Sequence, residues 1–354
     1  MKVFDTIIIG AGQCGLYAAK QLHDKNLNYL VLERNVVGQV WLNRLDGMRL
    51  FTSRQFCNLP GLPLPGDPAE FPKVCEIGRY LKIYANQFNL NIRELADVIS
   101  LVKKSNIFIL ELSSGEQLHA RTVVNATGSN QSVTIPNISK LLSEKVCQLT
   151  SQLSSLSIVP NDSNVVVVGD GASGRQIAGG LAQRCQVTLS TGTSRGLLPN
   201  RVLGKDLFWW LKNLGILNAS NSSFIAKILK NRNPIPCANF NNKELKTLGV
   251  DIKPRLLSCS NEIVTFLDGS TKTIDVVIWA VGYQDNTQWL KLPHCSDGNG
   301  FIHNQGETPE PGLFIIGRKW FSCRGSELIL GVERDVNHVI TLLESYMEKW
   351  KKIL

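Results

Sequence analysis

The fold is decided by residues 7–25, which read IIIGAGQCGLYAAKQLHDK. The apolar run predicts a buried strand, and the residues after the glycines predict a helix. The glycines fit the pattern GxGxxG: Gly10 allows a tight turn, Gly12 lets the backbone approach a pyrophosphate, and Gly15 lets helix and strand pack closely. The N–H groups at the start of that helix would then face the phosphates.

A second apolar run follows this helix and ends at an acid. Residues 29–32, YLVL, predict a strand, and Glu33 stands eighteen residues after Gly15. A carboxylate at this spacing accepts hydrogen bonds from both hydroxyls of an unphosphorylated ribose. Strand, glycine turn, helix, strand and acid in this order predict a dinucleotide-binding unit of Rossmann type. The alternative is an ordinary glycine-rich turn, against which the complete structural context argues.

The opening pattern occurs a second time. Residues 165–174 read VVVVGDGASG and lead into another helix-prone stretch. Two such units in one chain imply two dinucleotides. Eighteen residues after Gly174 stands Gly192 instead of an acid, among hydroxyls and close to Arg195. Hydroxyls and an arginine accept a 2′-phosphate, which a carboxylate would repel, so we expect NADPH here. Arg195 is either a ligand of that phosphate or a surface arginine.

Size and composition narrow the class of protein. The chain has 354 residues, of which 43% are hydrophobic and 19% charged, as in a globular protein large enough for two cores. No apolar run approaches the roughly 20 residues that a membrane span needs. The N-terminal stretch resembles a signal peptide, but Asp5 interrupts it. We therefore expect a cytoplasmic protein with no membrane span.

Cysteine usage and charge exclude several functions. Nine cysteines are scattered without any CxxC pair, which argues against a disulfide framework, a zinc site and the redox dithiol of a thioredoxin-reductase-like enzyme. We expect no metal. The net charge is +9, but Lys and Arg are dispersed. They are expected to serve solubility and dinucleotide phosphates, and no nucleic acid.

Several stretches carry a resemblance to a known family. They are GAGQCGL at 10–16, GQVW at 38–41, RLFTSRQFCNLPGLPLPG at 49–66, NATG at 125–128, GDGASGRQIA at 169–178, LLPNRVLGK at 197–205 and WAVGY at 279–283. The glycine motifs fit any flavoprotein with two dinucleotides, whereas the RQFCNLPG loop and LLPNRVLGK are more specific. Over nearly its whole length the chain resembles the flavin-containing monooxygenases of the short bacterial type. It is also similar to the plant YUCCA-type flavin monooxygenases.

The resemblance implies an α/β fold of two Rossmann-like dinucleotide-binding domains, with the NAD(P)H domain inserted into the FAD domain. We expect the FAD domain at 1–150 and 285–354 and the NAD(P)H domain at 158–284. The Ser-, Asn- and Pro-rich stretch 130–162 is the expected linker. Apolar residues at helical spacing over 336–350 predict a C-terminal helix that docks on its own domain, in preference to a helix lying on a membrane.

The resemblance also implies which residues form the site. It places FAD against Gly10, Gly12, Gly15 and Glu33, with Gln39 and Trp41 near the flavin. It places NADPH, with NADH as an alternative, against Gly169, Gly171, Ser173 and Gly174, with Arg195 as phosphate ligand. The further cofactor-binding residues expected are Gln13, Cys14, Arg34, Val40, Ala126, Thr127, Gly128, Ala172, Thr191, Gly282, Gly317 and Gly325. The expected catalytic residues are Phe51, Tyr283 and Arg324. The turn beginning at Arg324-Gly325 would present its helix N-terminus to the flavin pyrimidine edge.

The sequence departs from the family pattern at two points. Gln148 falls where the linker signature of the family has a histidine. Residues 50–53, LFTS, stand where eukaryotic members tend to carry an Asn beside the reactive flavin carbon. Some short bacterial members also have Phe there. Neither departure concerns flavin binding.

The family resemblance implies a monooxygenase that reduces FAD with NAD(P)H. The reduced flavin would form a C4a-peroxyflavin with O2 and oxygenate a small organic substrate, either a soft nucleophile or a ketone. One alternative is an NAD(P)H oxidase or flavin reductase that releases H2O2. Another is a non-catalytic flavin-binding accessory protein. A homodimer is compatible with the sequence.

Overall fold

The first sheet is built around β1 (Val3–Ile9), the strand that leads into the first glycine turn. The computed structural model describes residues 2–237 and 239–351. β1 runs parallel to β2 (Tyr29–Leu32) and to β6 (Gln117–Asn125), so the predicted strands are confirmed. β6 then pairs parallel with β23 (Leu313–Ile315), far along the chain. The outer strands of this sheet are β3 (Ile92–Arg93), β4 (Val98–Lys104) and β5 (Ile107–Leu112).

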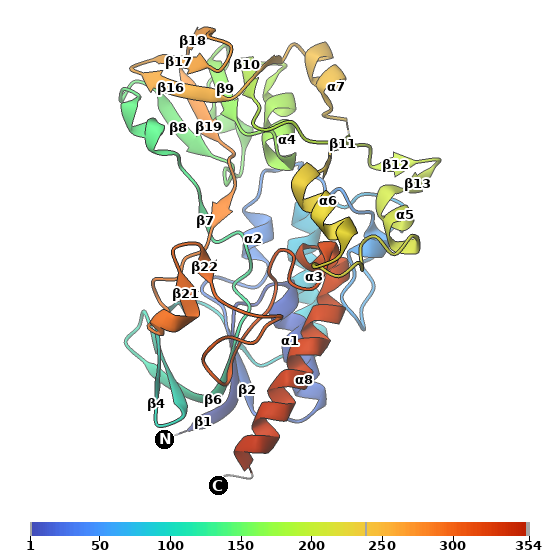
Figure 1. The fold of residues 1–354 in the computed structure, drawn as a ribbon, viewed down its shortest axis with the longest axis vertical. Coiled ribbons are helices and arrows are strands. Elements are labelled where there is room, and N and C mark those ends of the chain that lie inside the picture. Colours follow the sequence, from blue (N-terminus) through green and yellow to red (C-terminus); the bar gives the residue numbers. More distant parts are fainter. Residues whose placement is uncertain (1, 238, 352–354) are drawn as a thin grey trace.

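Three helices cover one face of this sheet (Figure 1). They are α1 (Gln13–Asp24), α3 (Val74–Gln87) and α8 (Val332–Lys351). The apolar residues of α8 between Val336 and Met347 are buried against α1 and the sheet. The predicted C-terminal helix docked on its own domain is therefore confirmed. Among the described residues, no helix is long and apolar enough to cross a membrane.

The second sheet contains five parallel strands in the order β15-β10-β9-β19-β8. The central β9 (Asn164–Val168) leads through the second glycine turn into α4 (Ala172–Leu181). The other strands are β10 (Gln186–Ser190), β15 (Asp251–Lys253), β19 (Val276–Trp279) and β8 (Cys147–Thr150). A small antiparallel sheet covers the face opposite α4; its strands are β16 (Leu256–Ser260), β17 (Ile263–Phe266) and β18 (Thr271–Thr273).

The chain leaves the first sheet after β6 and returns to it with β23, so the second unit is inserted into the first. The two connecting segments pair with each other as β7 (Ser132–Val133) and β20 (Tyr283–Gln284). The α/β fold with two Rossmann-type units, one inserted in the other, is confirmed (Figure 1).

The expectation that 130–162 is only a linker is wrong. This stretch contains β7, β8 and two 3-10 turns, Asn137–Leu141 and Leu156–Ile158. β8 is an edge strand with polar and exposed positions, so it lacks the apolar signal of a buried strand. Because β8 pairs with β19, we propose that the second domain begins near residue 134 and ends near residue 282, instead of spanning 158–284.

A partly helical segment follows β10 and lies on the side of the molecule (Figure 1). Its buried residues Leu207, Phe208 and Leu217 pack against Phe56 and Leu328 of the first unit. Its elements are β11 (Leu197–Leu198), β12 (Arg201–Val202), β13 (Lys205–Asp206), α5 (Leu207–Asn213), α6 (Phe224–Arg232), β14 (Ile235–Pro236) and α7 (Asn242–Thr247). The short elements elsewhere are α2 (Gln39–Leu42), β21 (Ser296–Asp297) and β22 (Gly300–Phe301).

Candidate functional site

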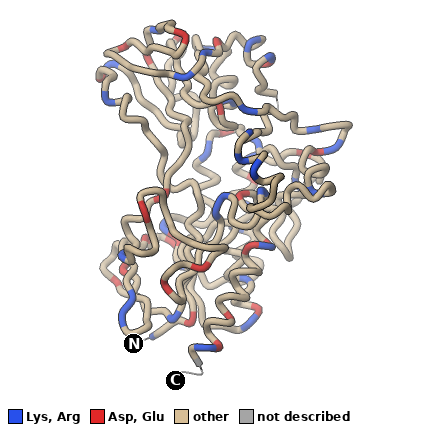
Figure 2. The backbone as a smooth tube through the Cα atoms, in the orientation of Figure 1, with Lys and Arg blue, Asp and Glu red and all other residues tan. Residues whose placement is uncertain are grey.

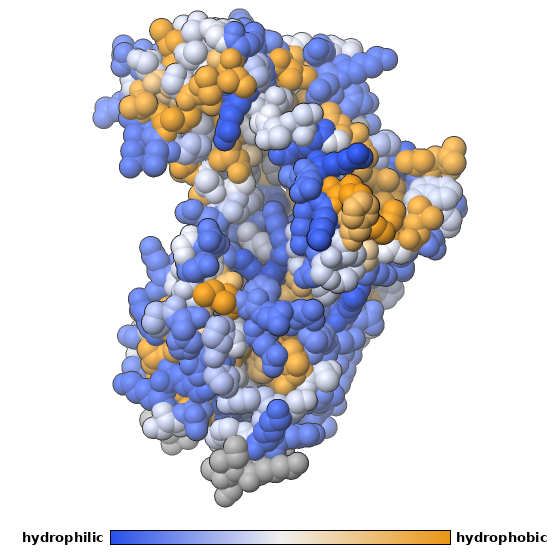
Figure 3. All heavy atoms as spheres, in the orientation of Figure 1, coloured by the Kyte–Doolittle hydropathy of each residue, from blue (hydrophilic) through white to orange (hydrophobic). Residues whose placement is uncertain are grey.

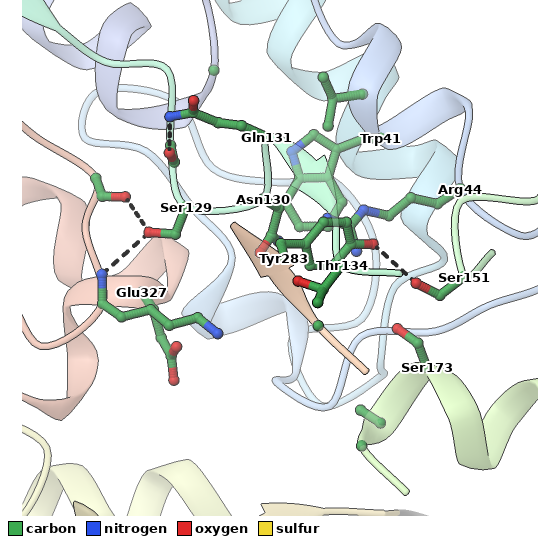
Figure 4. A pocket seen from close by; sticks show the side chains of 18 of the residues that line it. Trp41, Arg44, Ser129, Asn130, Gln131, Thr134, Ser151, Ser173, Tyr283 and Glu327 are labelled. Atoms are coloured by element: carbon green, nitrogen blue, oxygen red, sulfur yellow. Dashed lines mark hydrogen bonds between the residues drawn. The ribbon is translucent and has the colours of Figure 1, made fainter. Parts of the chain in front are cut away.

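A cavity of about 1390 Å³ lies between the two units. Both glycine turns open into it, together with the ends of β6 and β19 and the segment after β23. Every predicted site residue lines this cavity except Gly15, Gly174 and Gly325. Figure 4 shows side chains from both units pointing into one space, among them Trp41, Tyr283 and Ser173. The fold therefore brings the two predicted dinucleotide sites together.

The first glycine turn is shaped as its pattern predicts. Gly10 has φ +103°, and a Cβ there would meet the Ala126 carbonyl oxygen at 2.8 Å. A Cβ on Gly15 would overlap the Gly10 carbonyl oxygen, so α1 can pack on β1 only with glycine. Around Gly12, in contrast, a Cβ would meet nothing within 4 Å. The turn therefore leaves an open cradle at the N-terminus of α1, where backbone N–H groups can bind a pyrophosphate.

Glu33 is held in place at the end of β2. Its Oε2 accepts a hydrogen bond from the Ala11 N–H at 2.9 Å, and its Oε1 accepts one from the Asn35 N–H at 3.0 Å. These contacts fix the carboxylate beside the glycine turn, and Glu33 lines the cavity. Each oxygen keeps a further lone pair with which it can accept a hydrogen bond from a ribose hydroxyl.

The second glycine turn repeats the first in detail. Gly169 has φ +109°, and a Cβ there would overlap the Ala280 carbonyl, just as Ala126 closes the first turn. A Cβ on Gly174 would overlap the Gly169 carbonyl oxygen, while Gly171 faces open space. A second pyrophosphate cradle therefore opens at the N-terminus of α4.

A buried charge network underlies this second turn, and sequence reasoning missed it. Asp170, only 5% exposed, lies 3.6 Å from the Arg175 guanidinium and 3.4 Å from that of Arg195. Arg175 is 2% exposed and donates hydrogen bonds to the carbonyl oxygens of Asp170 and Phe240 and to Asn242 Oδ1. Burial lowers the pKa of Arg175, and the charge of Asp170 opposes that shift.

Arg195 lines the cavity at the edge of this network. Its guanidinium pairs with Asp170, and the phosphate role of Arg195 stays a prediction. A carboxylate is thus present near the second site after all, placed directly after Gly169 and not at the end of β10. An acid directly after the first glycine of the turn, followed by Arg175 near the start of α4, was the sequence signal that could have revealed this charge network.

The three predicted catalytic residues lie on the cavity wall at separate points. Phe51 stacks on Phe208, with ring centroids 5.8 Å apart. The Tyr283 hydroxyl lies 3.4 Å from Ser151 Oγ, a contact visible in Figure 4. Arg324 forms an ion pair with Glu327, and burial lowers its pKa.

A turn begins at Arg324, as expected, but the helix that follows it starts later in the chain. Residues Arg324–Glu327 and Ile329–Gly331 form two separate 3-10 turns, and α8 begins only at Val332. Leu328 between them has extended backbone, with φ −105° and ψ 158°, which interrupts the helical hydrogen-bond pattern. Residues of both turns line the cavity, the last of them Ile329, and α8 begins three residues after it.

Further cations that sequence reasoning missed also line the cavity, among them Arg44 and Lys319. The Arg44 guanidinium lies 5.1 Å from the centroid of the Trp41 ring, and Figure 4 shows both pointing toward Tyr283. Lys319 extends into the cavity from the segment after β23. Loss of hydration lowers the pKa of Lys319, and the nearby Arg324 and Arg318 lower it further.

Cys14 lies beneath the first glycine turn, and Gln148 lies between two strands of the second sheet. Cys14 is buried beneath the first turn, and burial together with Asp335 raises its pKa to about 12, so the thiol stays neutral. Gln148, found where the family signature has histidine, does not line the cavity. Its Oε1 accepts a hydrogen bond from Trp279 Nε1 at 3.1 Å and so joins β8 to β19.

Comparisons with known proteins agree with this architecture. Residues 7–199 match the profile of a family described as pyridine nucleotide-disulphide oxidoreductase. The chain is 39% identical to an uncharacterised CzcO-like oxidoreductase of Geobacillus kaustophilus, over 96% of this chain and 97% of that protein. It is 27% identical to the probable indole-3-pyruvate monooxygenase YUCCA9 of Arabidopsis thaliana, over 94% and 89%.

A solved structure has the same fold. The flavin-containing monooxygenase from Stenotrophomonas maltophilia superposes with a TM-score of 0.83 at 22% identity, over 98% of this chain and 100% of that one. The resemblance to short bacterial flavin-containing monooxygenases and to YUCCA-type proteins is therefore confirmed. The chain belongs to the pyridine nucleotide-disulphide oxidoreductase family and is a relative of the CzcO-like oxidoreductases.

Proposed function

We propose that this protein is a monooxygenase that uses FAD and NADPH to oxygenate a small organic substrate, either a soft nucleophile or a ketone. The observation that carries the proposal is the pair of matching cradles, at Gly12 and Gly171, that open into one cavity. Two open cradles at helix N-termini fit two pyrophosphates, and a shared cavity lets the two cofactors meet. FAD, when bound, supplies the hydride acceptance and oxygen activation that side chains lack.

The residues of the first unit would bind and orient FAD. The N–H groups at the start of α1 would hold its pyrophosphate, and Glu33 would accept hydrogen bonds from its ribose. Trp41 and Phe51 would form part of the wall around the flavin ring and keep water from it. Lys319 and Arg44 would place positive charge where negative charge develops during reduction and oxygenation.

The residues of the second unit would bind NADPH. The start of α4 would hold the pyrophosphate, and Thr191 and Arg195, which line the same cavity, would face the phosphorylated ribose. NADH stays the alternative coenzyme.

A cytoplasmic location and a homodimer also remain predictions. Measurement of the mass of the protein in solution tests the second.

One experiment separates the three candidate functions. The spectrum of the purified protein is recorded, and NADPH or NADH is then added in air, with and without a thioether or a cyclic ketone. Coenzyme oxidation coupled to an oxygenated product supports the monooxygenase. Peroxide release equal to coenzyme oxidation with every substrate would replace it with an oxidase. A flavin that neither coenzyme reduces would support the non-catalytic accessory protein.

A further inference from the structure

One flank of the protein exposes six large apolar side chains. It is formed by the β12–β13 hairpin, the end of α5 and helix α6. Leu203 at the hairpin tip is 87% exposed and Phe224 at the start of α6 is 76% exposed. Figure 3 shows these apolar side chains gathered on the side of the molecule where α5, α6 and the hairpin lie in Figure 1. The exposed set is Val202, Leu203, Leu214, Phe224, Ile225 and Ile228.

Helix α6 carries apolar side chains on its outer side as well as on its inner side. Its inner side carries Ala226, which is buried, and Leu229, which lines the cavity. Phe224 and Ile228 lie one turn apart on the outer side, in contact with solvent. At helical spacing, Lys227 borders this apolar strip. Helix α6 is therefore packed on the protein by its inner side, and its outer side exposes an apolar strip that is bordered by a lysine.

The charge of the flank is also one-sided. Residues 197–233 contain six Lys or Arg and one acidic residue, so they contribute five of the net nine positive charges of the chain. The single acid, Asp206, is buried, where it accepts hydrogen bonds from the N–H groups of Ser53 and Phe208. Figure 2 shows Lys and Arg along α6 and the hairpin. In the described part of the chain none of the six pairs with a carboxylate; they are Arg201, Lys205, Lys212, Lys227, Lys230 and Arg232.

We propose that this flank attaches the protein reversibly to the surface of a bilayer that contains anionic phospholipid. The apolar tips would enter the boundary between headgroups and acyl chains, and the lysines and arginines would meet the phosphates. Helix α6 has nine residues, so it lies on a membrane and cannot cross one. The attachment would bring the cavity, lined by Leu229 of the same helix, close to the bilayer.

Two other occupants fit the flank less well. A second copy of the chain would bring two segments of the same positive charge face to face, and like charges across an interface repel. A nucleic acid would neutralise the charge but would leave aliphatic tips such as Leu203 and Ile228 without an apolar partner. An anionic bilayer surface offers phosphates to the lysines and arginines of the flank and an apolar environment to its exposed aliphatic side chains.

The test is co-sedimentation of the full-length, FAD-saturated protein with vesicles. Phosphatidylcholine vesicles containing about one-third phosphatidylglycerol are compared with vesicles of phosphatidylcholine alone. We expect binding to the anionic vesicles only, and a loss of that binding when salt is raised from about 0.1 M to about 1 M. Lys227→Gln with Arg232→Gln should weaken binding by about fivefold for each removed charge. Phe224→Ser with Ile228→Ser should weaken it at least about tenfold.

A control changes one exposed apolar residue and one exposed lysine at or beside the small antiparallel sheet. Leu267 is exposed in the β17–β18 turn, and the exposed Lys145, just before β8, pairs with Glu262 of the β16–β17 turn. Leu267→Ser with Lys145→Gln should leave vesicle binding unchanged. Thermal unfolding and FAD content show whether each variant is folded. The proposal is overturned if wild type ignores anionic vesicles, or if the α6 variants bind like the control. It is also overturned if Phe224→Ser changes the mass in solution and not vesicle binding, because the occupant is then a second copy. Vesicle binding does not depend on catalysis, so failure here leaves the proposed function untouched.

Discussion

The Arg195 Nε atom lies 3.4 Å from a carboxylate oxygen of Asp170, beside the turn in which Gly171 leaves space for a phosphate. Asp170 is also paired with the buried Arg175, so one negative charge faces two positive ones. The surplus positive charge belongs to Arg195, which lines the cavity. A coenzyme phosphate near this point would therefore find an arginine that is already oriented.

Replacement of Arg195 should separate the two coenzymes. We expect Arg195→Ala to lower kcat/KM for NADPH by about 10- to 100-fold, because a charge-assisted hydrogen bond to a phosphate contributes about 1.5–3 kcal/mol. The value for NADH should change little, since NADH lacks the 2′-phosphate. Steady-state kinetics with both coenzymes measures the difference. Arg93→Ala, which removes an exposed arginine paired with Glu116 in the first unit, serves as control. Equal losses for both coenzymes would assign Arg195 a structural role.

Arg175 should matter for stability more than for coenzyme choice. Arg175→Met would leave the buried Asp170 with only the partly exposed Arg195 and would strand the carbonyl of Phe240. Breaking a buried pair by removal of one partner costs about 3–5 kcal/mol. The free energy of unfolding from urea denaturation should fall by this amount, with an unchanged m-value. A loss below about 1 kcal/mol would show that water reaches the network.

The sequence predicts what is encoded locally and misses what depends on distant partners. Both glycine turns could be predicted because each places three glycines between a strand and a helix at fixed spacing. The Asp170–Arg175 pair has a local sequence signal, but the rest of its network could not be predicted, because Phe240 and Asn242 lie more than sixty residues from Arg175 along the chain. β8 was missed because an edge strand with exposed polar residues carries no buried apolar run.

The glycines of each cradle should fall into two classes when they are replaced by alanine. Gly171→Ala has room for its Cβ and should cost less than about 1 kcal/mol of stability, yet the methyl group would stand where the pyrophosphate approaches. We expect a folded protein whose affinity for NADPH falls at least about tenfold. Gly174→Ala would push a Cβ into the Gly169 carbonyl oxygen and should destabilise the fold by about 3 kcal/mol.

The same contrast is expected in the first unit, between Gly12→Ala for FAD affinity and Gly15→Ala for stability. Titration of each variant with coenzyme and thermal unfolding without it separate the two effects. Full coenzyme affinity in both Gly12→Ala and Gly171→Ala would mean that neither open cradle receives a phosphate.

The last prediction concerns Asp335, which lies in the first turn of α8 and is 2% exposed. Its carboxylate accepts a hydrogen bond from the Ser322 hydroxyl, but its second oxygen has no hydrogen-bond donor among the described residues. Burial raises the pKa of Asp335 in the folded protein. At a pH between the ordinary aspartate value of about 3.9 and this raised pKa, the folded state holds a proton that the unfolded state has released, so stability falls as pH rises through that interval. Asp335→Asn removes this pH-dependent loss of stability. The free energy of unfolding of the variant should therefore exceed that of wild type by more at neutral pH than near pH 4. Urea denaturation at both pH values, with saturating FAD, measures the difference. An advantage that is equal at the two pH values would show that the buried carboxyl does not titrate between them.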